Sequence, residues 1–255
     1  MEQVLELKHI HYSYHTLDGE TPALTDISFA VERGEFIAIV GPSGCGKTTL
    51  LSLIAGLLTP EKGLIKINGK YVTESTTNVG YMLQHDELFE WRTIYHNVVL
   101  GLEIQHMMTA KNRQRAGDLL DSYGLGPFRN SRPSELSGGM RQRAALIRTL
   151  VLEPDLLLLD EPFSALDYQT RLNVGDDIGQ ILRKEGKSAV LVTHDLSEAI
   201  SLADRVIILS ERPATILQTV PLIFALAKDT PLNRRNAPEF KTYFQLIWKE
   251  LNPHA

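Results

Sequence analysis

The sequence predicts an α/β fold built on a parallel β-sheet, and three observations lead to this prediction. Short runs that are apolar throughout, at 36–40, 156–159 and 189–192, are typical of strands buried on both faces of a parallel sheet. Segments with helical periodicity separate several of these runs, which is the alternation that right-handed strand–helix–strand connections produce. A chain of 255 residues, 43% of them hydrophobic, is long enough to bury a sizeable core.

The first part of the chain predicts an antiparallel β subdomain around the first buried strand. Residues 4–10 alternate in hydropathy, residues 27–31 follow a turn region, and turn signals flank a short strand at 64–67. A glycine-rich segment follows the buried strand, and residues 47–55 then have the pattern of a helix.

Helical periodicity dominates from about residue 94 to residue 150, after a short strand at 79–83. A further strand at 206–209 and helices at 171–184, 196–203 and 238–251 complete the predicted elements. We therefore expect one domain over 1–255, in which the antiparallel β part and the parallel core occupy roughly 1–88 and 151–225, an inserted helical subdomain roughly 89–150, and a short C-terminal helical tail roughly 226–255.

Composition and charge exclude several classes of protein. Lys and Arg number 26 against 31 Asp and Glu, and a formal net charge of −5 disfavours nucleic-acid binding. No apolar run approaches the roughly 18 residues that a membrane span needs, and the N-terminus lacks the features of a signal peptide. We therefore expect a soluble, cytoplasmic protein, and any role at a membrane has to involve a partner.

Residues 41–48, Gly-Pro-Ser-Gly-Cys-Gly-Lys-Thr, match G-x-x-x-x-G-K-[ST] between the first buried strand and a helix. Glycines let the backbone turn its N–H groups toward phosphate oxygens, and the helix adds the positive end of its dipole. Lys47 is expected to reach the β- and γ-phosphates, and Thr48 to ligate Mg²⁺. The predicted nucleotide-binding residues of this segment are Gly41, Ser43, Gly44, Cys45, Gly46, Lys47, Thr48 and Thr49.

Two further segments carry candidate site residues. The strand at 156–159 ends in Asp160 and Glu161, whose side chains point in different directions, so that Asp160 is predicted to hold Mg²⁺ and Glu161 to polarise the attacking water. Acids that merely end a strand at the surface are the alternative. The Ser-Gly-Gly at 137–139 begins a helix, and a helix N-terminus can bind an anion, although such a segment is by itself usually a simple turn.

In chain order, five motifs resemble those of an ATP-binding cassette (ABC) ATPase: the phosphate loop, Leu-Ser-Gly-Gly at 136–139, the Asp-Glu strand end, Ser-Ala-Leu-Asp at 164–167 and Thr-His-Asp at 193–195. The resemblance extends over nearly the whole chain. It implies a P-loop NTPase core of the RecA-like type and a head-to-tail homodimer that encloses two ATP molecules. Each ATP would lie between the phosphate loop of one subunit and Ser137, Gly138 and Gly139 of the other.

The resemblance also implies roles for single residues. Gln84 would contact Mg²⁺ and water and connect the site to a membrane partner, and His194 would contact the γ-phosphate, so that both join Glu161 as catalytic residues. Asp167 would communicate across the dimer interface. Tyr14 would stack on adenine, with Tyr12 as the competing candidate.

A single cassette favours the energising subunit of a multi-subunit importer. Three stretches, at 88–94, 210–216 and 236–240, resemble the nitrate, sulfonate and taurine import branch of the family. This implies an ATP-hydrolysing subunit at the cytoplasmic face of the membrane. Its partners would be integral membrane permease subunits and, indirectly, a substrate-binding protein. The solute would be nitrate, a sulfonate, taurine or a thiamine precursor. The alternative is a soluble ABC-type switch acting on a non-transport complex.

Two smaller expectations concern the single cysteine and a group of histidines. Cys45, beside Lys47 and a helix N-terminus, is expected to ionise more readily than a free thiol and so to be reactive, unless it packs inward. His9 and His11 would share one strand face near His15, but no acidic or cysteine partner accompanies them in the sequence, so a solvated strand is expected instead of a metal site.

Overall fold

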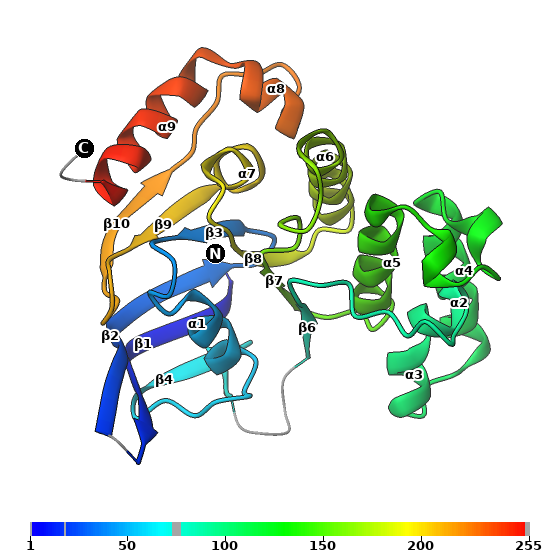
Figure 1. Cartoon of the computed structure of the whole chain (residues 1–255), viewed down its shortest axis with the longest axis horizontal. Coiled ribbons are helices and arrows are strands. Elements are labelled where there is room, and N and C mark those ends of the chain that lie inside the picture. The colour runs from blue at the N-terminus through cyan, green and yellow to red at the C-terminus, as the bar shows by residue number, and fades with distance from the viewer. Residues whose placement is uncertain (1, 18, 73–77, 253–255) are drawn as a thin grey trace.

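The strands form two sheets of different character (Figure 1). The computed structural model describes residues 2–17, 19–72 and 78–252. Within them, one sheet is antiparallel, with the order β2-β1-β4-β5, and its strands are β1 (Gln3–Thr16), β2 (Gly19–Glu32), β4 (Lys62–Ile67) and β5 (Lys70–Tyr71). The other has the order β10-β9-β3-β8-β7-β6 and consists of β3 (Phe36–Val40), β6 (Val79–Met82), β7 (Leu156–Asp160), β8 (Ser188–Val192), β9 (Arg205–Leu209) and β10 (Ile216–Pro221). It is parallel except for β10, which runs antiparallel to β9.

The central strands of the larger sheet are buried on both faces, as the apolar runs predict. In β3, Ile37 and Ile39 join a core cluster that also contains the antiparallel sheet, whereas Ala38 and Val40 join a cluster on the opposite face. The same alternation continues along β7, β8 and β9. The parallel sheet is therefore the middle layer of the molecule, which is the α/β arrangement that the sequence predicts.

Helices cover the two faces of the larger sheet unequally (Figure 1). Helix α1 (Lys47–Ile54) packs in the cluster shared with the antiparallel sheet, and α7 (Leu196–Leu202) contacts β3 and β9 from the other side. The remaining helices are α2 (Ile94–Val98), α3 (Leu100–Ile104), α4 (Ala110–Ser122), α5 (Gly138–Leu150), α6 (Tyr168–Lys184), α8 (Pro231–Asn236) and α9 (Pro238–Leu251), with 3₁₀ turns at Gly126–Phe128 and Pro133–Glu135. The part with α2 to α5 stands at one end of the sheet and shares the α7-side core cluster with it.

Differences from the predicted elements are confined to polar or half-exposed segments. Strands β1 and β2 form a long hairpin and extend much further than expected. The sequence does not indicate their outer halves as strands, because those halves carry few buried side chains and therefore lack a hydropathy signal. Strand β10 was not predicted, since only Val220 among its six residues is buried. Helix α8 also escaped prediction, and its six residues are too few for a helical period to be recognised.

Candidate nucleotide-binding site

The phosphate loop at 41–48 joins the carboxyl end of β3 to the start of α1. Gly44 and Gly46 have φ angles of 75° and 119°, a region of backbone conformation that residues with a side chain seldom adopt. A Cβ added at Gly46 would also lie 2.9 Å from Cδ2 of Leu24 in the neighbouring hairpin. Both glycines are thus required for the curvature of the loop, and Gly46 is also required for its packing.

Lys47 points back into the loop that precedes it. Its Nζ donates hydrogen bonds to the carbonyl oxygens of Gly41 and Pro42, each over 2.9 Å, and the residue is only 7% exposed. The ammonium group therefore lies at the centre of the loop, where it can meet an incoming phosphate.

The loop faces the end of β7 across a pocket of about 360 Å³. The described residues that line it are Ser43, Gly44, Gly46, Lys47, Thr48, Thr49, Gln84, Asp160 and Glu161. Segments that lie far apart in the sequence thus meet at one place, at the carboxyl ends of parallel strands, where α/β proteins usually bind ligands.

Thr48 and Asp160 form the part of the pocket that suits a cation. The Thr48 hydroxyl donates to Oδ1 of Asp160 over 3.2 Å, and the Tyr81 hydroxyl donates to Oδ2 over 3.4 Å. Burial raises the pKa of Asp160, and burial followed by the nearby Asp160 charge raises the pKa of Tyr81 to about 12. Hydroxyl and carboxylate oxygens are hard donors of the kind Mg²⁺ prefers, so these two side chains fit that ion.

Glu161 points away from Asp160 and toward His194. The Oε2 atom of Glu161 lies 3.0 Å from Nδ1 of His194, which follows β8 and is half exposed. The Glu161 backbone has φ 45°, and its N–H donates to the carbonyl of Val192 over 2.8 Å. The adjacent carboxylates therefore have separate surroundings, as their alternation along a strand predicts.

Gln84 lies on the same side of the pocket, beyond β6. Its Nε2 donates to the Ser164 hydroxyl over 3.3 Å, and that hydroxyl donates to the carbonyl of Glu161 over 2.9 Å. This chain of hydrogen bonds links the exposed Gln84 side chain to the segment that carries Glu161.

Tyr14 and Tyr12 differ in their access to the phosphate-loop helix. The Tyr14 hydroxyl is 2.8 Å from Oγ1 of Thr49, and the Arg212 guanidinium lies over its ring, 5.6 Å from the centroid. Tyr12 packs on the core cluster beneath and meets Tyr14 edge-on, with ring centroids 5.1 Å apart. The geometry favours Tyr14 as the exposed ring beside α1, and sequence reasoning missed Arg212.

The remaining predicted residues lie outside the lining of this pocket. Ser137 is the N-cap of α5, and its hydroxyl accepts a hydrogen bond from the backbone N–H of Met140 over 3.4 Å. Asp167 caps α6 by accepting from the backbone N–H of Thr170, and hydrogen bonds to that residue lower the pKa of the Asp167 carboxyl. The segments are neighbours, because a Cβ added at Gly138 would lie 3.0 Å from Cδ2 of Leu166 and one at Gly139 would lie 2.7 Å from Cγ2 of Val174.

A family model described as ABC transporter matches residues 24–164, which is more than half of the chain. The chain belongs to this family. It is 48% identical over 248 residues to the ABC transporter ATP-binding protein YtlC of Bacillus subtilis, with 97% of this chain and 95% of YtlC covered. It is 40% identical over 243 residues to the nitrate import ATP-binding protein NrtD of Synechocystis sp., with 94% and 91% covered.

A solved structure supports the same assignment for the fold of this ABC protein. The dimeric structure of the ATP-binding cassette MJ0796 bound to ADP and Pi superposes with a TM-score of 0.73, at 29% identity, over 86% of this chain and 99% of that one. The predicted family, its resemblance to the import branch and the predicted fold are confirmed. Among the described residues, no helix of this ABC chain is both long enough and apolar enough to cross a bilayer.

The prediction of a reactive Cys45 in the ABC phosphate loop was wrong. The side chain is 1% exposed and lies in the core cluster between the sheets, and burial raises the pKa of its thiol although Lys47 acts in the opposite direction. The sequence pattern locates the residue in the loop but does not reveal that its side chain points inward. Any contribution of Cys45 to binding therefore comes from its backbone.

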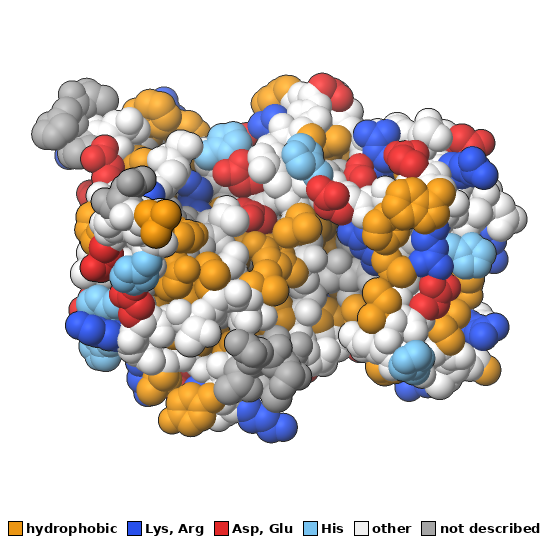
Figure 2. All heavy atoms as spheres, turned by 60° about the horizontal axis from the view of Figure 1, so that its bottom comes forward, with side chains coloured by type: hydrophobic (Ala, Val, Ile, Leu, Met, Phe, Trp, Pro, Cys, Tyr) orange, Lys and Arg blue, Asp and Glu red, His pale blue; other side chains and the backbone are white. Residues whose placement is uncertain are grey.

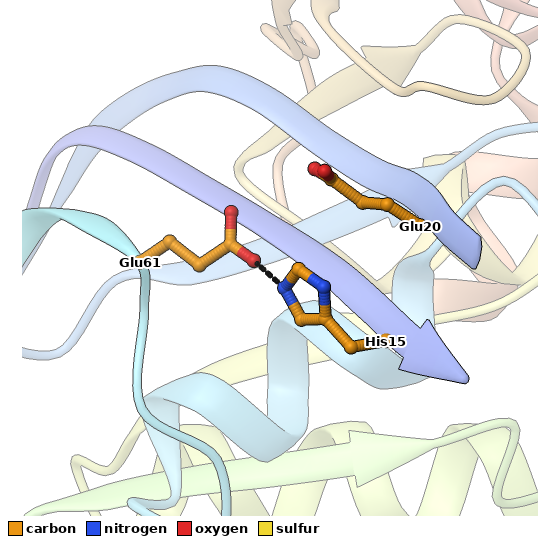
Figure 3. A group of neighbouring side chains, drawn as sticks. All are labelled: His15, Glu20 and Glu61. Carbon is orange, nitrogen blue, oxygen red and sulfur yellow. Dashed lines mark hydrogen bonds and ion pairs between the residues drawn. The ribbon is translucent and has the colours of Figure 1, made fainter. Parts of the chain in front are cut away.

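The histidines of the hairpin do have acidic partners, contrary to the prediction. Nδ1 of His9 lies 2.6 Å from Oδ1 of Asp26, and Nε2 of His15 lies 2.7 Å from Oε1 of Glu61 (Figure 3). Glu20, opposite His15 on β2, completes a group with ligand atoms within 4.8 Å of one another. The Ser13 hydroxyl contacts both carboxylates, so the polar groups of this cluster already satisfy one another.

Proposed function

We propose that this ABC chain binds and hydrolyses MgATP and thereby drives the import of a small solute through a separate membrane permease. The observation that carries the proposal is that one pocket brings the phosphate loop with Lys47 face to face with Asp160, Glu161 and Gln84. We also propose that residues 1–255 act as one ATPase domain with the division into subdomains predicted above.

Each side chain has a step to perform in this proposal. Lys47 and the loop N–H groups bind the phosphates, while Thr48 and Asp160 hold Mg²⁺, which when bound offsets the charge that develops on the phosphate oxygens. The Glu161 carboxylate accepts a proton from the attacking water as the water oxygen bonds to the γ-phosphorus and ADP leaves. His194, whose Nδ1 lies 3.0 Å from that carboxylate, contacts the γ-phosphate. Gln84 orients the attacking water and connects the site to the membrane permease.

The proposed working form is a head-to-tail homodimer. Ser137, Gly138 and Gly139 lie at the N-terminus of α5, outside the pocket of their own subunit, and are free to complete the pocket of a second copy. Asp167 lies next to them and belongs to the same interface. The MJ0796 cassette, which forms a dimer with ADP and Pi, supports this arrangement.

The permease would contact the surface beside Gln84. Leu83 and Trp91 are 45% and 74% exposed, and the Trp91 ring lies against the ring of the partly exposed Phe89, with centroids 4.7 Å apart. Figure 2 shows hydrophobic side chains gathered between the two ends of one face of the molecule, with charges of both signs around them. Exposed apolar groups of this kind suit a protein partner at the cytoplasmic face of the membrane. The similarity to NrtD supports nitrate or a related small solute, such as a sulfonate, taurine or a thiamine precursor.

The proposal is tested with the purified chain and its Glu161→Gln variant. The amide keeps the size of the side chain but cannot accept the proton, so we expect phosphate release to fall by at least about 100-fold. ATP binding should remain, and size-exclusion chromatography with MgATP should show a dimer. Phosphate release at the wild-type rate would contradict the role of Glu161.

The import role needs a second measurement. The affinity-tagged chain, purified from a detergent-solubilised membrane fraction of its own host, should bring down a multi-span membrane protein in a fixed ratio. Recovery of a soluble complex in place of that protein would support the alternative of a non-transport switch.

A further inference from the structure

Thr193, Glu198 and Arg171 form a connected group next to His194, and of these three only Thr193 belongs to a sequence motif. Thr193 directly precedes His194, Glu198 lies four residues after it in α7, and Arg171 approaches Glu198 from the first turn of α6. Thr193 is 1% exposed and Glu198 is 8% exposed, so these two side chains lie beneath the surface that carries the half-exposed His194 ring.

Thr193 and Glu198 fix the backbone on both sides of His194. The Thr193 hydroxyl donates to Oε2 of Glu198 over 2.6 Å and accepts from the backbone N–H of Asp195 over 3.0 Å. One hydroxyl thus ties together the residue before His194 and the residue after it. Because Glu198 belongs to α7, the orientation of this loop depends on a helix that is packed on the sheet.

Arg171 connects this loop to the segment that ends in Asp167. Its Nη2 donates to the carbonyl of Leu166 over 3.1 Å, and its Nη1 donates to Oδ2 of Asp195 over 3.4 Å. Its buried Nε has no hydrogen-bond acceptor within the described parts of the chain and lies 3.9 Å from Oε1 of Glu198. The Arg171 guanidinium bonds these two partners through two separate nitrogens of a rigid planar fork, whereas a lysine carries a single nitrogen that cannot occupy both positions.

We propose that Arg171, supported by Thr193 and Glu198, is a positioning residue that couples the placement of the Asp167 segment to the placement of His194. When Leu166, the residue before Asp167, moves, the Arg171 guanidinium that is bonded to its carbonyl moves with it. The guanidinium then displaces Asp195, which is next to His194. Contact across the proposed dimer interface would then set the distance between His194 and Glu161. The inference rests on the proposed ATPase function and extends it.

The test compares Arg171→Lys with Arg183→Lys. Arg183 is a matched control on the same helix, because its Nη2 also bridges a carbonyl, that of Leu202, and a carboxylate, that of Asp204. Both variants keep the positive charge. We expect Arg171→Lys to lower kcat for ATP hydrolysis at least about tenfold with a KM for ATP within about twofold of wild type, because the single lysine nitrogen cannot take the places of both Nη1 and Nη2. Arg183→Lys should leave both constants within about twofold.

A double-mutant comparison separates positioning from general loss of structure. In a His194→Ala background, measured by single-turnover hydrolysis, Arg171→Lys should add less than about a twofold loss, since the residue it positions is already gone. Thr193→Val, which removes the hydroxyl at nearly unchanged volume, should show the same kcat effect and the same lack of additivity, and it serves as the second variant if Arg171→Lys does not fold.

The outcomes that overturn the inference differ from those that overturn the proposed function. An active wild type whose Arg171→Lys variant behaves like Arg183→Lys contradicts the inference alone. The same holds if Arg171→Lys reduces the His194→Ala rate by the full factor seen in wild type. A wild-type chain that binds MgATP but never hydrolyses it contradicts the proposed function.

Discussion

Replacing Glu198 by glutamine should change how the stability of the protein depends on pH. The pKa of the Glu198 carboxyl is raised from 4.5 to about 7, above all by burial and also by the charge of Asp195, while the hydrogen bond from Thr193 and the charge of Arg171 act in the opposite direction. The pKa of Glu198 is higher in the folded state than in the unfolded state, so its protonated form stabilises the fold. This contribution is fully present below pH 4.5 and is lost as the pH rises through 7.

The size of the effect follows from the two pKa values. A difference of one in pKa corresponds to about 1.4 kcal/mol, so ionisation of Glu198 lowers the free energy of unfolding by about 3 kcal/mol above pH 7. For a chain of this size, about 1 kcal/mol shifts Tm by roughly 2–4 °C, which gives roughly 6–12 °C. The glutamine cannot ionise, and it keeps an oxygen that accepts from Thr193.

The assay is Tm by circular dichroism for wild type and Glu198→Gln at pH 5 and pH 8. The difference between variant and wild type removes the contributions of all other titrating groups. It should be small at pH 5 and should favour the variant by roughly 6–12 °C at pH 8. A difference that stays the same within about 1 °C at both values would refute the argument, since Glu198 would then ionise as an ordinary carboxyl does.

Three further predictions concern the nucleotide site. Lys47→Ala and Ser137→Arg subunits should each be inactive alone, and mixing them should restore part of the ATPase activity, because a mixed head-to-tail dimer contains one intact composite site. Activity in unmixed Ser137→Arg would contradict the role of Ser137 in that site. Tyr14→Ala should weaken binding of a fluorescent ATP analogue about fivefold or more through lost stacking, whereas Tyr12→Phe should bind normally. N-ethylmaleimide should leave folded wild type and Cys45→Ser equally active, since the thiol is buried; rapid modification without unfolding, seen by mass spectrometry, would show that the loop opens.

The central strands and the phosphate loop could be predicted because their signals are local. The five apolar residues of β3 indicate a strand buried on both faces, and the spacing of Gly46 and Lys47 indicates the loop that follows. The juxtaposition of Thr48 with Asp160 could also be anticipated, since the carboxyl ends of parallel strands meet at one edge of a sheet.

What could not be predicted depends on directions and on distant partners. The pattern that includes Cys45 is the same whether its side chain faces the phosphates or the core, and only the packing between the sheets decides this. His15 and Glu61 are separated by 45 intervening residues and meet because β1 pairs with both β2 and β4. Arg171 and Glu198 are each unremarkable charges on helices until α6 and α7 pack side by side.

The hydrogen bonds from Lys47 to Gly41 and Pro42 bear on how mutations of this lysine are interpreted. An ammonium group has three N–H donors, and the two bonds to carbonyls leave one that can be directed at a phosphate oxygen without breaking either. The loop is therefore braced into shape before the nucleotide arrives, and little conformational entropy is left to lose on binding. Substituting Lys47 removes the two hydrogen bonds that hold the loop in shape together with the positive charge. The resulting loss of affinity for ATP therefore includes the loss of loop structure as well as a missing phosphate contact.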